Sequence, residues 1–352
     1  MNKIDNIEIK NFKSIRHQKI EGCKKINVFI GYPNTGKSNI LEALSLFCVN
    51  GEGFDLSRLV RFEKLTTFFY NGEVGERVQV IVNMRLRYFI ENFSNFLRFT
   101  SEFDSGSLGF EVLDNNQGSS REKISSFEIN DRSSQVYNFW RKNNTDLPEI
   151  KKYEFLKSVS LNDKSSNYSF LMFPNGNNLF NIISANPTLK KDINSLFEEY
   201  NLELLYESRE QKFTILKRTD SGIFSIPYEL VADTLQRLIF YKAAIASNKN
   251  SILLFEEPEA QMFPPYISKF TGSVWESETN QFFITTHSPY VINDFLENCK
   301  DELNIYIVNY VKGETKILKL TEENLDTIYN MGAESVFYNL EKFSIDENTI
   351  HT

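Results

Sequence analysis

Apolar and polar residues alternate over residues 4–9 ("IDNIEI"), a period that predicts a β-strand at the start of the chain. A second strand is predicted by the apolar run in "KINVFIG", which begins at Lys25. From Ser38 the stretch "SNILEALSLF" places apolar residues at helical spacing. The beginning of the chain is therefore predicted to run strand, loop, helix.

A second group of patterned segments begins at Tyr228. "ELVADTLQRLIFYKAAIAS" has helical spacing, whereas "SILLFEEPEA" and "QFFITTHSPYVIND" are apolar runs that end abruptly in polar residues. Such strand ends are where ligands bind in open parallel sheets. The stretches "NIYIVNYV" and "ETKILKL" predict further strands, and "NLDTIYNMGAESVFYNL" predicts a C-terminal helix.

The loop between the second strand and the first helix has the spacing Gly31-x-x-x-x-Gly36-Lys37-Ser38. This spacing is typical of a phosphate-binding loop, in which backbone N–H groups surround an anion at a helix N-terminus. Lys37 would reach the β- and γ-phosphates of a nucleotide, and the Ser38 hydroxyl would bind Mg²⁺. The alternative is a glycine-rich turn that matches the spacing by chance.

The patterned segments predict an α/β fold with a mixed sheet core. We expect a nucleotide-binding domain that is split between residues 1–84 and 226–352. Residues 85–225 would form an inserted lobe, either α/β or helical.

Two adjacent carboxylates, Glu256 and Glu257, end the apolar strand in "ILLFEEPEA". Burying them is costly unless a cation or a reaction partner compensates their charge. Glu256 would then bind Mg²⁺, and Glu257 would polarise an attacking water. The alternative is an acidic helix start with Pro258 at the first helical position.

His287 follows directly after the apolar run "FFITT". At a strand end it could donate a hydrogen bond to a γ-phosphate oxygen. The alternative is a histidine of the core or of a helix start, since Ser288 and Pro289 form a plausible cap and first helical residue.

Composition limits the remaining function classes. Of the 352 residues, 41% are hydrophobic and 24% are charged, as is usual for a globular protein. No run of about 18 apolar residues suggests a membrane span, and the alternating N-terminus does not resemble a signal peptide. We therefore expect a cytoplasmic protein without a membrane partner. The three scattered cysteines fit neither a disulfide framework nor a zinc site, and the net charge of −8 leaves DNA binding open.

These motifs, together with the N-terminal "IEIKNFKSI", resemble the ABC-type ATPases of the SMC, RecF and overcoming-lysogenization-defect (OLD) group. The resemblance covers about residues 1–80 and 228–295. It implies a P-loop ATPase that binds ATP and Mg²⁺ and forms a dimer with each ATP sandwiched between two protomers. It also assigns a nucleotide-binding loop, a Walker B pair of Glu256 and Glu257, and a switch histidine, His287. The expected nucleotide-binding residues are Gly31, Asn34, Thr35, Gly36, Lys37, Ser38 and Asn39.

Two features depart from this group. Its members carry a Leu-Ser-x-Gly-like signature before the Walker B strand, where this chain has Ala232, Asp233 and Thr234. The Thr234 hydroxyl or the N-terminus of its helix would then contact the partner's ATP. The stretch after His287 is also too short for the TOPRIM nuclease domain that many OLD proteins carry, so we expect the ATPase half alone.

The resemblance favours a role in DNA repair or bacterial anti-phage defence, with a separately encoded effector. The expected partners are a second copy or a higher oligomer, an effector nuclease or toxin, and DNA. The alternative is a nucleotide-gated scaffold or sensor whose slow turnover holds and releases a partner. Basic residues of the inserted lobe are candidates for phosphate contacts, although ordinary charges on a solvated face are the commoner outcome. They are Arg85, Arg87, Arg98, Arg141, Lys142, Lys151 and Lys152. Asn71 is a candidate for the glutamine-loop position or for an ordinary turn residue.

Overall fold

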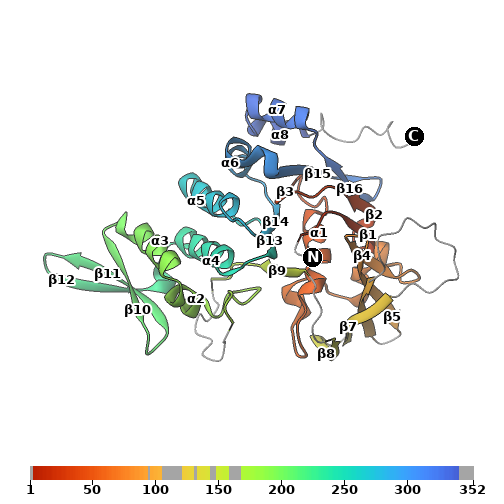
Figure 1. The fold of residues 1–352 in the computed structure, drawn as a ribbon, viewed down its shortest axis with the longest axis horizontal. Coiled ribbons are helices and arrows are strands. Elements are labelled where there is room, and N and C mark those ends of the chain that lie inside the picture. The colour runs from red at the N-terminus through yellow and green to blue at the C-terminus, as the bar shows by residue number, and fades with distance from the viewer. Residues whose placement is uncertain are drawn as a thin grey trace.

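The computed structural model describes residues 3–93, 96–104, 121–130, 133–142, 148–157 and 168–340. Within these residues the chain forms three sheets, called here the central, antiparallel and projecting sheets (Figure 1). None of the described helices is long and apolar enough to cross a membrane.

The central sheet has the strand order β16-β15-β3-β14-β13-β9, and all neighbours pair in parallel except β15 and β16. Strands β3, β13 and β14 are buried almost throughout, which is why they appear in the sequence as continuous apolar runs. The mixed sheet confirms the predicted fold class. Its strands are β3 (Ile26–Ile30), β9 (Glu149–Tyr153), β13 (Ser251–Glu256), β14 (Gln281–Thr285), β15 (Leu303–Val311) and β16 (Glu314–Lys319).

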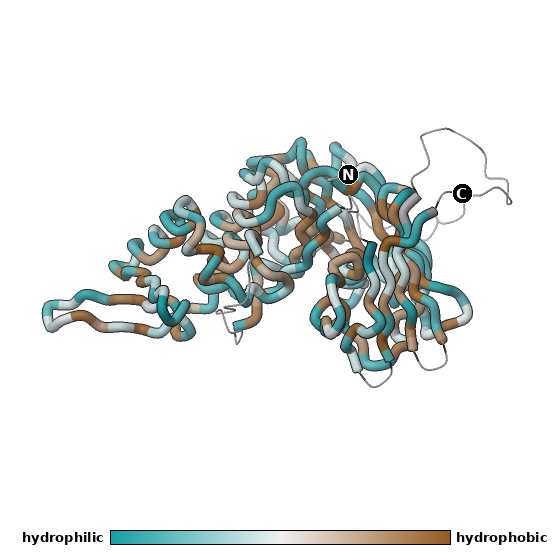
Figure 2. Tube along the Cα trace, turned by 60° about the horizontal axis from the view of Figure 1, so that its bottom comes forward, coloured by the Kyte–Doolittle hydropathy of each residue, from teal (hydrophilic) through white to brown (hydrophobic). Residues whose placement is uncertain are grey.

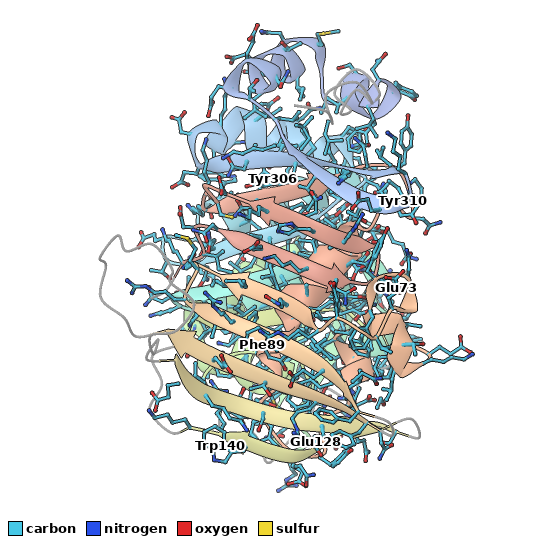
Figure 3. All side chains as sticks on the ribbon, turned by 90° about the vertical axis from the view of Figure 1, so that its right-hand side faces the viewer. Glu73, Phe89, Glu128, Trp140, Tyr306 and Tyr310 are labelled. Carbon is cyan, nitrogen blue, oxygen red and sulfur yellow. The ribbon has the colours of Figure 1, made fainter. Side chains whose placement is uncertain are left out.

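The antiparallel sheet has the order β2-β1-β4-β5-β6-β7-β8. At the start of β1, buried residues alternate with partly exposed ones, because one face of this sheet packs on the core. Phe89, Glu128 and Trp140 lie on three of these strands in Figure 3. Its strands are β1 (Ile7–Phe12), β2 (Ile15–Ile20), β4 (Val78–Val82), β5 (Leu86–Phe93), β6 (Phe96–Asp104), β7 (Arg121–Asn130) and β8 (Ser133–Arg141).

Helix α1 (Lys37–Ser45) lies between the two sheets and is buried along most of its length. Its apolar residues share one core with Phe29, Phe283 and Tyr306 of the central sheet and with inward-facing residues of the antiparallel sheet. The other face of the central sheet is covered by α4 (Asp233–Ser247), α5 (Pro264–Trp275) and α6 (Pro289–Cys299) (Figure 1). The predicted phosphate loop thus leads into a helix that packs between the two sheets.

The predicted inserted lobe, residues 85–225, contributes to all three sheets. Strands β5 to β8 extend the antiparallel sheet from β4, and β9 pairs with β13 at the edge of the central sheet. The rest projects from the molecule (Figures 1 and 2). The division into domains stays a prediction. The projecting part consists of α2 (Leu179–Ala185), α3 (Pro187–Glu198) and the projecting sheet of β10 (Leu202–Glu207), β11 (Lys212–Thr219) and β12 (Gly222–Pro227).

The predicted C-terminal helix is two helices, α7 (Glu322–Met331) and α8 (Glu334–Tyr338). Gly332 separates them because its φ of +84° lies in a region that a continuing helix cannot adopt. Short 3₁₀ helices connect other elements: η1 (Leu46–Cys48), η2 (Leu56–Arg58), η3 (Leu65–Phe68), η4 (Tyr70–Gly72), η5 (Tyr228–Leu230) and η6 (Lys300–Glu302).

Candidate active site

The two glycines of the predicted phosphate loop stand where a side chain cannot fit. A Cβ on Gly31, whose φ is +155°, would lie 2.2 Å from the carbonyl oxygen of Val308 on β15. A Cβ on Gly36, at φ +97°, would lie 2.2 Å from Thr315 Oγ1 on β16. The loop therefore needs glycine at both positions to pack against β15 and β16 while turning into α1.

Hydrogen bonds of side-chain hydroxyl and amide groups fix the conformation of this loop. Thr35 Oγ1 donates to the Tyr32 carbonyl at 3.0 Å, and Thr315 Oγ1 donates to the Thr35 carbonyl at 2.8 Å. Asn39 Nδ2 donates to Ser14 Oγ at 2.6 Å, and Ser14 Oγ lies 2.6 Å from Thr315 Oγ1. Of the predicted nucleotide-binding residues, Thr35 and Asn39 thus support the loop. Ser14 belongs to the N-terminal stretch "IEIKNFKSI", but sequence reasoning did not link it or Thr315 to the loop.

The ammonium group of Lys37 lies inside the loop. Its Nζ donates to the carbonyls of Gly31, at 3.1 Å, and Tyr32, at 2.8 Å. Burial lowers the pKa of Lys37, and the negative charges of Glu257 and Glu256 offset part of that effect. Lys37 therefore places a positive charge at the loop, where it could pair with an anionic phosphate.

Glu256, the last residue of β13, is held by Ser38 and two cations. It accepts a hydrogen bond from the Ser38 hydroxyl, and its carboxylate lies 3.1 Å from Arg61 Nη2 and 3.4 Å from Lys152 Nζ. Burial raises the pKa of Glu256, but the charges of Lys152 and Arg61 and the Ser38 hydrogen bond outweigh it and lower the pKa below its usual value. Glu256 is therefore a carboxylate at neutral pH.

The Ser38 hydroxyl and the Glu256 carboxylate fit a Mg²⁺ ion. Mg²⁺ prefers oxygen ligands and in nucleotide sites is bound through one or two carboxylates plus phosphates and waters. Among the described residues, no cluster of three His, Cys, Asp or Glu side chains could hold a metal alone. This donor set is therefore suited to a metal that arrives with a nucleotide.

Glu257 and His287 face each other across the ends of β13 and β14. His287 Nε2 lies 3.2 Å from Glu257 Oε1. Glu257 has a φ of +43°, a strained conformation for a non-glycine residue of the kind that concentrates at functional sites, and its N–H donates to the Thr285 carbonyl at 3.0 Å. Burial and the nearby charge of Lys37 lower the pKa of His287 despite Glu257, so its imidazole is neutral at neutral pH.

These residues line one cavity of about 620 Å³, within the usual range for a small-molecule site. The cavity brings together predicted residues from three distant parts of the chain: Asn34, Thr35, Gly36, Lys37, Ser38, Asn39, Glu256, Glu257 and His287. Sequence reasoning did not identify the rest of its wall, which includes Ser14, Arg61, Glu154, Phe155, Arg237 and Tyr241.

Thr234 lies outside the lining of this cavity. It is the second residue of α4, and its hydroxyl donates to the carbonyl of Gln261 at 2.7 Å. The preceding Asp233 forms an ion pair with Lys157 at 2.5 Å, which offsets the negative charge at this helix start. A contact of Thr234 with a partner's nucleotide stays a prediction.

Three further residues considered in the sequence analysis do not line the cavity. Lys151 and Lys152 are buried in the central sheet, where Lys151 bonds Glu149 and Asn248 and Lys152 bonds Glu256 and the Leu59 carbonyl. They are therefore not exposed candidates for DNA contact. Asn71 has a left-handed φ of +52° and does not line the cavity, as expected of a turn residue.

Comparison with known proteins gives a family match and several partial relatives. Residues 26–293 match the family described as "AAA domain, putative AbiEii toxin, Type IV TA system". An uncharacterised protein of Methanocaldococcus jannaschii is 51% identical over 74 residues, which are 21% of this chain and 32% of that protein. An "ATP/GTP phosphatase" of Helicobacter pylori is 33% identical over 93 residues, 23% of this chain and 25% of the relative.

A "DNA replication and repair protein RecF" of Caldanaerobacter subterraneus is 35% identical over 69 residues, 19% of this chain and 18% of RecF. The chain thus spans about a third or less of the length of these curated relatives. Among solved structures, the "SmcHead bound to the C-winged helix domain of ScpA" is 16% identical and covers 92% of this chain and 99% of its own, with a TM-score of 0.51. By the family match, the chain belongs to the AAA-domain family of that description, and its fold is similar to that of the SMC head.

Proposed function

We propose that this chain binds Mg·ATP and hydrolyses it. The observation that carries this proposal is the convergence of Lys37, Ser38, Glu256, Glu257 and His287 on one cavity, although they come from three separate segments. A phosphate loop, an oxygen donor set for Mg²⁺, and a carboxylate beside a neutral histidine are the parts that phosphoryl transfer to water requires.

Each residue has a defined task in this reaction. Lys37 and the loop N–H groups hold the β- and γ-phosphates, and Ser38 and Glu256 would hold Mg²⁺. A bound metal would neutralise part of the negative charge of the phosphates. Glu257 accepts the proton of a water whose oxygen attacks the γ-phosphorus as the bond to the ADP oxygen breaks. His287, neutral at neutral pH, donates its N–H to a γ-phosphate oxygen as charge develops there.

The proposal includes an ATP-dependent dimer. Three large apolar side chains are exposed within three residues of cavity-lining positions: Tyr32 at 45%, Phe263 at 64% and Tyr290 at 51%. We take these side chains, each close in sequence to a residue that lines the cavity, as candidates for an association surface. A second protomer that covers the cavity would bury them and bring the N-terminus of its α4 to the nucleotide.

The biological setting that we propose is DNA repair or anti-phage defence with a separately encoded effector nuclease or toxin. One relative is a "DNA replication and repair protein", and the similar SMC head is bound to a domain of ScpA. Action on DNA or a protein partner, in the cytoplasm, is therefore part of the proposal.

A second candidate is a nucleotide-gated scaffold with slow turnover. Ala232 cannot donate the hydrogen bond of a signature serine, and the Thr234 hydroxyl proton is already donated to Gln261. Steady-state hydrolysis by the purified protein, with and without Mg²⁺, separates the two. Multiple turnovers per minute support the ATPase; binding with less than about one turnover per hour supports the scaffold.

Changing His287 to alanine should lower turnover by about 10²-fold while ATP affinity falls less than threefold. The reason is that a contact to the γ-phosphate strengthens as charge develops in the transition state. The measurement compares kcat with the Kd of Mg·ATP from calorimetry. Equal losses in both would indicate that His287 has only a structural role.

A further inference from the structure

Glu259 is a buried carboxyl group behind the candidate active site. It lies two residues after Glu257, is 7% exposed, and is not among the residues that line the cavity. Its Oε1 accepts a hydrogen bond from Thr286 Oγ1 at 2.5 Å and a second from the His287 N–H at 3.2 Å. One carboxyl oxygen therefore binds two consecutive residues of the loop that carries His287.

The same loop is fixed further by Thr286. Its N–H donates to the Phe29 carbonyl on β3 at 3.2 Å, and its Oγ1 accepts from the Ser288 N–H at 3.0 Å. The loops after β13 and β14 are thus joined twice. One contact, between Glu257 and His287, lies in the cavity, and the other, from Glu259 to Thr286 and His287, lies behind it.

The contact of Glu259 with Thr286 and His287 is not explained by a contribution to stability alone. Among the described residues, Glu259 Oε2 is buried and has no hydrogen-bond partner. A buried polar atom without a partner disfavours folding, and an apolar side chain at this position would avoid the cost. The arrangement is instead suited to fixing a backbone, because its acceptor takes a hydrogen bond from the His287 amide itself.

We propose that Glu259, through Thr286 and the His287 amide, is a positioning residue that sets His287 against Glu257 for the reaction. This inference rests on the proposed function, in which Glu257 and His287 act on the γ-phosphate. Small misplacements of a reacting group have large effects on rate, so the loss of this contact lowers turnover and leaves ATP binding nearly unchanged.

A double-mutant cycle tests the positioning role. Glu259→Ala and Thr286→Val should each lower kcat by about tenfold or more, with the KM for ATP changed less than twofold. In a protein that already carries His287→Ala, the same changes should have almost no further effect on kcat, because Glu259 acts only through His287. Glu259→Gln and Thr286→Ser, which keep the acceptor oxygen and the hydroxyl, should retain most of the activity.

The outcomes separate this inference from the function on which it rests. Equal losses with and without His287 would mean that Glu259 and Thr286 act by another route, and would overturn the positioning role. Full activity of both Glu259→Ala and Thr286→Val beside an inactive His287→Ala would overturn it and leave the proposed function intact. A fully active His287→Ala would overturn both. If Glu259→Ala does not fold, Thr286→Val decides, since valine keeps the shape of threonine.

Discussion

Replacing Lys37 by alanine should weaken Mg·ATP binding by about 10- to 100-fold. Hydrogen bonds to a charged group contribute about 1.5–3 kcal/mol, and the phosphates would lose a positive charge that is 6% exposed and surrounded by the loop. The Kd of Mg·ATP from titration calorimetry measures this effect directly. The Lys37 variant must first show the melting temperature of a folded protein, because Gly31 and Tyr32 also lose a donor.

Lys242→Ala is the matched control. Like Lys37, Lys242 is largely buried. It forms an ion pair with Asp192 at 2.9 Å and does not line the cavity. Its loss should leave ATP affinity unchanged. An unchanged affinity in Lys37→Ala itself would mean that the loop between β3 and α1 is an ordinary glycine-rich turn.

The local elements of the site were predictable from sequence. Strands buried on both faces appear as unbroken apolar runs, so the ends of β3, β13 and β14 could be located to within a residue or two. Parallel strands bring their carboxyl ends to one edge of a sheet, which is why Lys37, Glu256 and His287 meet. The structure confirms the fold class and places these residues together, while their roles stay predictions.

The supports of the site were not predictable because they come from contacts between distant segments. Ser14 and Thr315, which are 301 positions apart, meet beside Gly36, and no local pattern at either residue indicates this contact. Arg61 and Lys152 reach Glu256 from a loop and from an edge strand. Lys152 is buried, where a basic residue is unusual, and its ion pair with Glu256 and its hydrogen bond to the Leu59 carbonyl explain this position, whereas the Arg61 side chain stays largely exposed.

The pairing of strands β5 to β8 could not be predicted from the sequence for the same reason, whereas the division into domains stays a prediction. Alternation predicts a half-buried strand but not its neighbour, so β5 to β8 could equally have formed a separate lobe. In the structure they continue the sheet that starts with β1 and β2. The continuous apolar core between this sheet and α1 explains the choice, because strands outside it would leave Leu97, Phe99 and Phe127 without burial.

Replacing Glu257 by glutamine should reduce ATP turnover by about 10²- to 10⁴-fold and leave Mg·ATP bound. Glutamine keeps the shape of the side chain but cannot accept the proton of the attacking water, and removal of a general base has effects of this size. Single-turnover hydrolysis measures the chemical step, and calorimetry measures the retained affinity. Normal turnover would remove Glu257 from the mechanism.

The same variant should form a dimer only with Mg·ATP, because a bound and uncleaved ligand at the interface favours the associated state by mass action. Light scattering with and without Mg·ATP measures the mass. Adding Phe263→Asp should abolish the dimer while ATP stays bound, since it places a charge at an exposed apolar side chain of the proposed interface, three residues after the cavity-lining Ala260. The control is Ile223→Asp on β12, an equally exposed apolar residue (61%) of the projecting sheet, which should leave the dimer intact. If the Glu257→Gln protein stays a monomer with ATP bound, the ATP-sandwich dimer is refuted. If it is a dimer without ATP and Ile223→Asp disrupts that dimer, the interface lies on the projecting sheet.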